Sequence, residues 1–132
     1  MGKTLSMQDI VSAQDVLTEF VPVPEWGGDV AVRMLTGLER DAFEAALVKV
    51  DAEGKRTPDL SNLRAKLAAA CMVDPVSGDR LFPDENLSQL AAKSATALDR
   101  VFKVAQRLNG MGDVEAVEKN SAAAPSGSST SA

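Results

Sequence analysis

Residues 16–50 read VLTEFVPVPEWGGDVAVRMLTGLERDAFEAALVKV, and this segment decides the fold that the sequence predicts. Residues 18–23 and 29–34 each alternate between two sets of side chains, which is the period-two pattern of a half-buried strand. Pro22 and Pro24 remove backbone donors from the first run, so this strand is expected to lie at a sheet edge or to end early. The segment therefore predicts a β-hairpin, and a helix follows it.

The turn between the two runs is predicted from its glycines. Gly27 and Gly28 supply the positive φ that a tight reversal needs. Trp26, directly before them, has two interpretations. Its ring either folds over the small sheet and extends the core, or it stands exposed as an anchor for a partner, because aromatic residues are enriched at binding hot spots.

A helix is predicted directly after the second run. Thr36 and Glu39 have the spacing of a capping box, in which each side chain accepts a hydrogen bond from the backbone N–H of the other residue. Apolar residues then recur at helical spacing to about residue 50, and charged residues fall mostly outside the face that they form. The residues expected on or beside this face are Leu38, Ala42, Phe43, Ala46, Leu47 and Val50.

Two longer helices are predicted downstream. Thr57 and Pro58 resemble an N-cap followed by a proline at the first helical position, so a second helix is expected from there to about residue 72. Another helix is expected to begin near Ser94 and to stop at Asn109 and Gly110. The core that all helices share is predicted to contain Phe43, Leu47, Leu63, Leu67, Leu98, Val101, Phe102 and Leu108.

The connecting segments and the termini carry weaker patterns. Residues 51–56 form a polar loop, and residues 73–82 form either a tiny second hairpin or an extended connector. A short helix with Asp84 as its N-cap is expected next. Residues 6–13 fit either a short capped helical turn or only a fold-back of the N-terminus onto the hairpin. Residues 113–132 are rich in Ser and Ala and are expected to be disordered, which leaves residues 1–112 as the folded domain.

Composition excludes several classes of function. The net charge is −5, with 14 basic residues scattered among 19 acidic ones, so a nucleic-acid-binding surface is not expected. The sequence contains no histidine and no phosphate-binding glycine loop, so neither a catalytic histidine pair nor a cofactor or metal site is expected. No membrane-spanning run is present. Cys71, the only cysteine, is interpreted as a small buried hydrophobe, with a reactive thiol as the alternative.

The order of several segments resembles a known family. These segments are VPEWGG at residues 23–28, VAVR at 30–33 and LTGLERD at 35–41, followed by the helix at 64–72, the turn at 73–82 and the helices at 90–110. The closing VEKNS at 117–121 also fits. This set is similar to the small tail assembly chaperones of long-tailed bacteriophages, and the similarity covers most of residues 8–121.

The resemblance implies a non-enzymatic function in the host cytoplasm. Members of that family bind the tape measure protein, keep it soluble and recruit the tail tube protein through a longer frameshifted form. The sequence does not say which surface binds, and self-association stays open. The partner-binding candidates are the hairpin turn, the adjacent strand and the alanine flank of the second long helix: Trp26, Gly27, Gly28, Arg33, Ala68 and Ala69.

Two alternatives remain at this stage. One is a structural or adaptor protein that is retained in the phage tail. The other is an unrelated hydrolase that uses carboxylates, which requires Asp41, Glu44, Asp74 and Asp79 to cluster in one pocket. For the fold, we expect an α+β protein, a mostly helical single domain with an N-terminal two-stranded β-hairpin, about four helices and a disordered tail.

The codons for residues 118–120 can form a slippery sequence in the mRNA. Glu118, Lys119 and Asn120 can be encoded by GAA-AAA-AAC, which contains the heptamer A-AAA-AAC. Both tRNAs can re-pair there after a one-base backward slip, and the resemblance implies that the longer form arises by such a slip near the end of the short form. The alternative is that these are ordinary tail residues with unrelated codons and that slippage occurs elsewhere or not at all. Synonymous recoding to GAG-AAG-AAC should abolish the larger product on an immunoblot. A larger product that persists after recoding would place the slip elsewhere.

Overall fold

The computed structural model describes residues 2–111. In order, its elements are α1 (Met7–Ser12), β1 (Thr18–Val23), the 3-10 turn η1 (Pro24–Trp26), β2 (Gly28–Arg33), α2 (Gly37–Ala45), β3 (Val48–Val50), β4 (Arg56–Pro58), α3 (Leu63–Cys71), β5 (Met72–Val73), η2 (Asp84–Asn86), α4 (Leu87–Ala91) and α5 (Ala95–Leu108). The fold is mixed α/β, and 45% of it is helical. The expected description "mostly helical" is therefore too strong. The expected tail at residues 113–132 lies outside the described residues.

The predicted N-terminal hairpin is present, and β1 is its edge strand. β1 and β2 pair antiparallel, from Thr18 opposite Arg33 to Val23 opposite Gly28. The Met34 N–H donates to the Leu17 carbonyl at 2.9 Å. Because antiparallel bonding alternates, the backbone groups of residue 22 then point away from β2. Pro22 therefore occupies a position where no ladder donor is needed.

The reversal depends on one glycine and not on the expected pair. Gly27 has φ of +83° and closes η1, with its N–H donating to the Pro24 carbonyl at 3.0 Å. Gly28 is already the first residue of β2. Pro24, at the start of η1, ends the strand, as the sequence predicted.

The expected two-stranded hairpin is only part of the sheet, because β5 adds a third strand to it. β5 pairs antiparallel with β2, with Ala31 opposite Val73 and Val32 opposite Met72. Helical periodicity placed Met72 at the end of a helix and gave no sign of a strand, because β5 is only two residues long and follows α3 without a loop. β5 is a strand only through its pairing with β2, which is distant along the chain. Of the two expectations for residues 73–82, the hairpin-like one is closer, because Val73 and Arg80 form a β-bridge.

The helix after β2 begins as predicted but ends early. Thr36 and Glu39 form the complete capping box of α2. The helix ends at Ala45, and β3 pairs with β4 in a second hairpin instead of continuing the helix to residue 50. The alternating Val-Lys-Val run favours a strand once a partner is available. Leu38 and Val50, both expected on the apolar face, are exposed.

The second long helix also begins later than predicted. Thr57 and Pro58 belong to β4 and not to a helix. β4 is joined to β3 by a turn in which Gly54 has φ of +84°. α3 starts at Leu63, after Asn62 in the left-handed region. The N-cap-and-proline pattern was therefore misassigned, because a proline at the end of a short edge strand satisfies the same local rule. Asp84 is likewise not an N-cap, since it is the first residue of η2.

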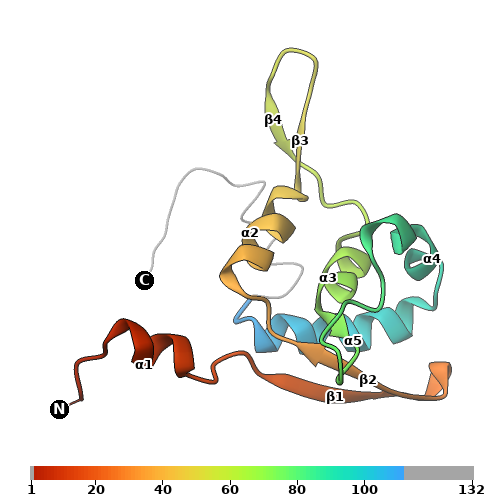
Figure 1. Ribbon diagram of the computed structural model, residues 1–132. Helices are drawn as coiled ribbons and strands as arrows, with labels where there is room; N and C mark the ends of the chain where they lie inside the picture. The colour runs from red at the N-terminus through yellow and green to blue at the C-terminus, as the bar shows by residue number, and fades with distance from the viewer. Residues whose placement is uncertain (1, 112–132) are drawn as a thin grey trace.

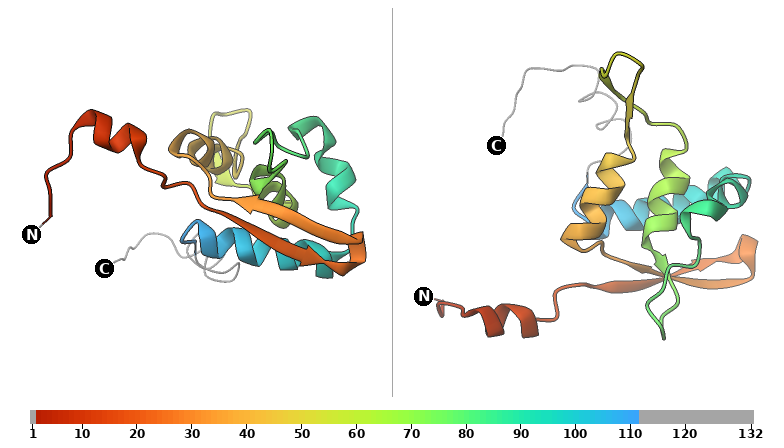
Figure 2. Two further views of the ribbon diagram at one scale, coloured as in Figure 1. Left: turned by 60° about the horizontal axis from the view of Figure 1, so that its bottom comes forward. Right: turned by 45° about the horizontal axis from the view of Figure 1, so that its top comes forward.

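α5 is the helix that the sequence predicted best. Ser94 caps it by accepting from the Ala97 N–H at 3.2 Å. At its end, the N–H groups of Gly110 and Met111 donate to the carbonyls of Arg107 and Gln106, which is the Schellman arrangement. α5 runs alongside the β1–β2 hairpin, whereas α3 lies across α5 and ends at the sheet, where β5 follows it (Figures 1 and 2).

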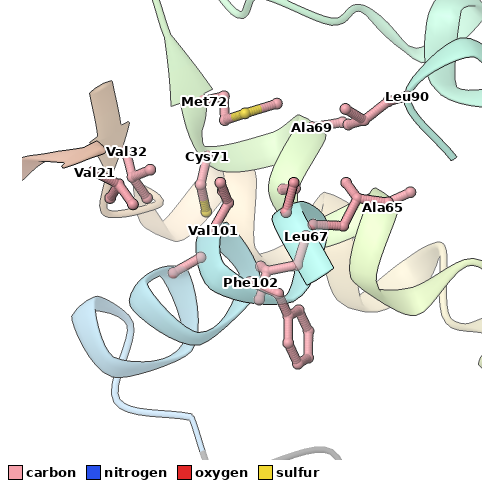
Figure 3. Close-up of a cluster of buried hydrophobic side chains, with 14 of the residues drawn as sticks. Val21, Val32, Ala65, Leu67, Ala69, Cys71, Met72, Leu90, Val101 and Phe102 are labelled. Atoms are coloured by element: carbon pink, nitrogen blue, oxygen red, sulfur yellow. The ribbon is translucent and has the colours of Figure 1, made fainter. Parts of the chain in front are cut away.

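One hydrophobic cluster joins the sheet to the helices (Figure 3). All eight predicted core residues belong to it or pack against it, with Leu47 and Leu108 only half-buried. The predicted core omitted Val21, Val23 and Val32 from the sheet and Met72 from β5, although all four are buried. The hairpin is further tied to α5 by ion pairs between Glu25 and Arg100 and between Glu19 and Arg107.

α1 does not fold back onto the hairpin as expected. Its capping box is complete, with Ser6 and Asp9 each accepting from the other's backbone N–H. None of its residues is buried, and it projects away from the rest of the protein (Figures 1 and 2). Of the two expectations for residues 6–13, the capped helical turn is observed and the fold-back onto the hairpin is not.

Phe102 is the test of the core. Its side chain is 2% exposed, so Phe102→Ala should lower the free energy of unfolding by about 3–5 kcal/mol. Phe20→Ala is the matched control, because Phe20 lies 59% exposed on β1 and its loss should cost about 1 kcal/mol or less. Urea titration measures both, and equal losses would contradict the packing described here.

Candidate partner-binding site

Two hollows flank Phe43, one on each side of the contact between α2 and α3. The first, which we call the alanine groove, has a volume of about 250 Å³ and opens between α2, α3 and the segment leading into α4. Its lining residues are Glu39, Ala42, Phe43, Ala46, Lys66, Ala69, Ala70, Arg80, Asp84 and Leu87. The second, the apolar groove, has a volume of about 290 Å³ and opens between α2, α3 and the end of α5.

The alanine groove exists because short side chains line both helices. Ala42 on α2 and Ala46, its C-cap residue, lie four residues apart, and Ala69 and Ala70 face them from α3. Methyl groups cannot fill the space between two helix backbones, so a hollow remains on this side of Phe43. The groove can therefore accept larger apolar side chains from outside.

Polar contacts hold the walls of the alanine groove. Lys66 on α3 donates from Nζ to the Ala46 carbonyl at 3.1 Å and so binds a carbonyl at the end of α2. Arg80 donates from Nε to the Ala69 carbonyl at 3.0 Å, and its guanidinium pairs with Asp84. Both cations therefore complement the carboxyl ends of helices, where carbonyls lack intrahelical partners.

Glu39 connects the groove to the sheet. Both of its carboxylate oxygens accept from Nη2 of Arg33, at 2.9 and 2.7 Å, and Oε1 also accepts from the Thr36 N–H at 2.9 Å. Burial raises the pKa of Glu39, but the Thr36 N–H and the Arg33 guanidinium outweigh burial and hold that pKa below its ordinary value. The first turn of α2 is thereby fixed to the end of β2.

The apolar groove is lined by large side chains instead of alanines. Its lining residues are Arg40, Phe43, Glu44, Leu47, Leu63, Leu67, Phe102, Gln106, Gly110 and Met111. Arg40 and Glu44, one helical turn apart on α2, form an ion pair at 3.0 Å along one edge of the groove. This internal pairing leaves the groove with an apolar floor and a balanced charge at its edge.

Asn109 holds together the elements around the apolar groove. Its Oδ1 accepts from the Leu35 N–H at 2.8 Å, and its Nδ2 donates to the Ala105 carbonyl at 2.8 Å. Arg40 on α2 donates to the Asn109 carbonyl at 3.1 Å. The sequence predicts Asn109 only as a helix stop, because its hydrogen-bond partners Leu35 and Arg40 are distant along the chain.

The structure brings together only some of the predicted partner-binding residues. Ala69 lines the alanine groove, and Arg33 supports the same groove through Glu39. Ala68 is fully buried and offers no surface. Gly27 and Gly28 are exposed at the hairpin turn and line neither groove. The sequence placed Ala42 and Ala46 beside a core-facing helix face; both are exposed and line the alanine groove.

The two open questions on Trp26 and Cys71 have structural answers. The Trp26 ring is half-buried and packs against the core, as in the first interpretation. Cys71 is completely buried, and burial raises the pKa of its thiol to about 12. The thiol is therefore protonated at neutral pH, which agrees with its interpretation as a small buried hydrophobe.

The four carboxylates required for a hydrolase fall on two segments, with Asp41 and Glu44 on α2 and Asp74 and Asp79 in the loop after β5. Glu44 lines the apolar groove, whereas the Asp74 carboxylate accepts from the N–H groups of Val76 and Ser77 in its own turn. Within residues 2–111, no group of three or more acidic, cysteine or histidine side chains is arranged to hold a metal ion. No helix in the same range combines the length and hydropathy required to cross a bilayer.

No protein-family model, curated protein or solved structure matches this chain.

The Glu39 carboxylate should make the stability of the folded protein depend on pH. Because its folded-state pKa lies below the ordinary 4.5, the ionised form stabilises the fold above that pH, and this contribution is lost as pH falls through the folded-state pKa. Glu39→Gln keeps the capping geometry but removes the charge, so it should lower stability at pH 7 and flatten the loss below about pH 4.5. Glu85→Gln, at an exposed position on η2, is the control. Melting temperatures measured from pH 7 to pH 3 should differ between Glu39→Gln and Glu85→Gln. Identical pH profiles for the two variants would contradict the role of Glu39 in stability.

Proposed function

We propose that this protein is a tail assembly chaperone of a long-tailed bacteriophage, which acts in the host cytoplasm. It binds the tape measure protein and keeps it soluble until the tail assembles. A longer frameshifted form recruits the tail tube protein. The protein works by binding and performs no catalysis. The ordered set of segments between residues 23 and 121 that resembles this family supports the proposal.

The alanine groove is the observation that carries the proposal. Helical clients are recognised when an amphipathic helix lays its apolar face into a hydrophobic groove. A floor of four alanines between two fixed helices lets the backbone of such a client approach closely and gives its larger side chains space. The tape measure protein is the client, because it is long, helical and exposes apolar faces before assembly.

The edge of the alanine groove suits reversible binding. It carries two cations, Lys66 and Arg80, and two anions, Glu39 and Asp84. This balance selects a client by its shape and apolar content, not by one sign of charge. A groove of this size contacts only a short length of helix, so affinity stays modest and tail tube subunits can displace the chaperone.

Two substitutions on α2 test the groove. Ala42→Glu places a charge inside the alanine groove, whereas Ala45→Glu places the same charge on an exposed position of α2 outside its lining. On co-expression with the tape measure protein of the same phage, the wild type and Ala45→Glu should raise the soluble yield of that protein. Ala42→Glu should lose at least about tenfold in complex recovered by pull-down, because the larger charged side chain occupies the space for the client's apolar side chains and must lose water when the client binds.

Thermal unfolding of both variants checks that the fold is retained. Equal recovery of complex with Ala42→Glu and Ala45→Glu would reject the groove as the client site. No effect of the wild type on client solubility would reject the chaperone function. Mass spectrometry of purified particles distinguishes the other candidate, since stoichiometric amounts of this chain in the virion would identify a structural or adaptor protein.

A further inference from the structure

Exposed apolar side chains are concentrated in the N-terminal part of the chain. The described residues contain eleven large hydrophobic residues that are exposed, and seven of them fall between residues 5 and 20. We call residues 2–17 the N-terminal arm. The seven residues are Leu5, Met7, Ile10, Val11, Val16, Leu17 and Phe20. An apolar surface of this extent on one segment indicates a binding partner.

α1, within this arm, has the form of a helical ligand. Met7, Ile10 and Val11 have the i, i+3, i+4 spacing that puts three apolar side chains on one helix face. The capping box of Ser6 and Asp9 fixes where the helix starts, so that this face is set by local sequence. An isolated helix of six residues is marginal in water, and a partner on its apolar face would stabilise it.

The same chain offers a surface with matching chemistry. The apolar groove is lined by Phe43, Leu47, Leu63, Leu67, Phe102 and Met111, of which Leu47 and Met111 are only half-buried. Its charged edge is already neutralised by the pair of Arg40 and Glu44. Such a groove favours an apolar helix face over a charged ligand. The arm that carries such a face projects away from the body (Figure 2).

We propose that α1 of one copy docks in the apolar groove of a second copy, and that two copies exchange arms in this way. Exchange pairs the same two surfaces twice around a two-fold axis, so both arms and both grooves are covered. The proposal does not depend on the proposed function, because it concerns two copies of this chain without a client.

The exposed area of the arm agrees with a stable dimer. Burial of one large apolar side chain removes on the order of 100 Å² from water, so the six exposed residues that lie within the arm supply roughly 600 Å². A standard interface takes about 800 Å² from each partner. With the groove residues added, reciprocal exchange reaches the size of a specific interface.

The first experiment measures the oligomeric state of the purified full chain, without a client. Sedimentation velocity over a hundredfold range of concentration should show a dimer for the wild type. Ile10→Glu places a charge on the apolar face of α1 and should shift the midpoint of dissociation at least tenfold higher in concentration. Gln8→Glu adds the same charge to the same helix off that face and should leave the dimer intact.

The second experiment locates the contact by disulfide cross-linking. Ile10→Cys and Leu47→Cys are introduced into separate chains of different mass, which are then mixed and oxidised. Cys71 does not interfere, since its thiol is buried and protonated. A cross-linked heterodimer should form within this mixture. The control replaces Leu47→Cys by Val76→Cys, which is 95% exposed on the loop after β5 and should cross-link at least tenfold less.

Three outcomes would overturn the proposal. The wild type could remain a monomer at every concentration. A double variant with Ile10→Cys and Leu47→Cys in one chain could form its disulfide within the monomer, which would mean that the arm folds into its own groove. Ile10→Glu could leave the dimer unchanged while it abolishes the client complex, which would assign the arm to the client.

Discussion

The burial of α3 positions the three helices α2, α4 and α5 against the sheet. Six of its nine residues are buried, and alanines among them allow the close crossing with α5. Cys71 ends the helix and Met72 begins β5 directly, so the same segment that packs against α5 also pairs with β2. Arg80 then binds the Ala69 carbonyl and fixes the returning chain to the end of α3. The helical layer and the sheet are therefore joined without a flexible connection.

Both grooves follow from the way in which α2 is attached to this centre. Phe43 is the one buried residue of α2, and it packs toward α3 with a hollow on each side. Hydrogen bonds at the helix ends fix the spacing between the helices. Lys66 on α3 donates to the Ala46 carbonyl at the end of α2, and Arg40 on α2 donates to the Asn109 carbonyl at the end of α5. Since these contacts saturate backbone groups, the hollows are bounded by satisfied polar walls.

Features that depend on neighbouring residues were predictable from the sequence. The capping boxes at Ser6 and Thr36, the cap at Ser94 and the stop at Gly110 are local chemistry, and each is present. Features that depend on distant pairing were missed. β5 and the β3–β4 hairpin are strands only because a partner lies beside them, and single-sequence periodicity cannot identify that partner.

The same distinction applies to the candidate site. Arg33 and Ala69 were predicted and do adjoin the alanine groove, because a strand end and an alanine flank are visible in the sequence. Asn109 was missed as a tertiary link. Pro22 has a consequence of another kind, since it faces outward on an edge strand that would otherwise offer donors to any passing extended chain. Next to the uncovered apolar side chains of the N-terminal arm, this proline removes one outward N–H of β1 and so interrupts the edge as a template for an added strand.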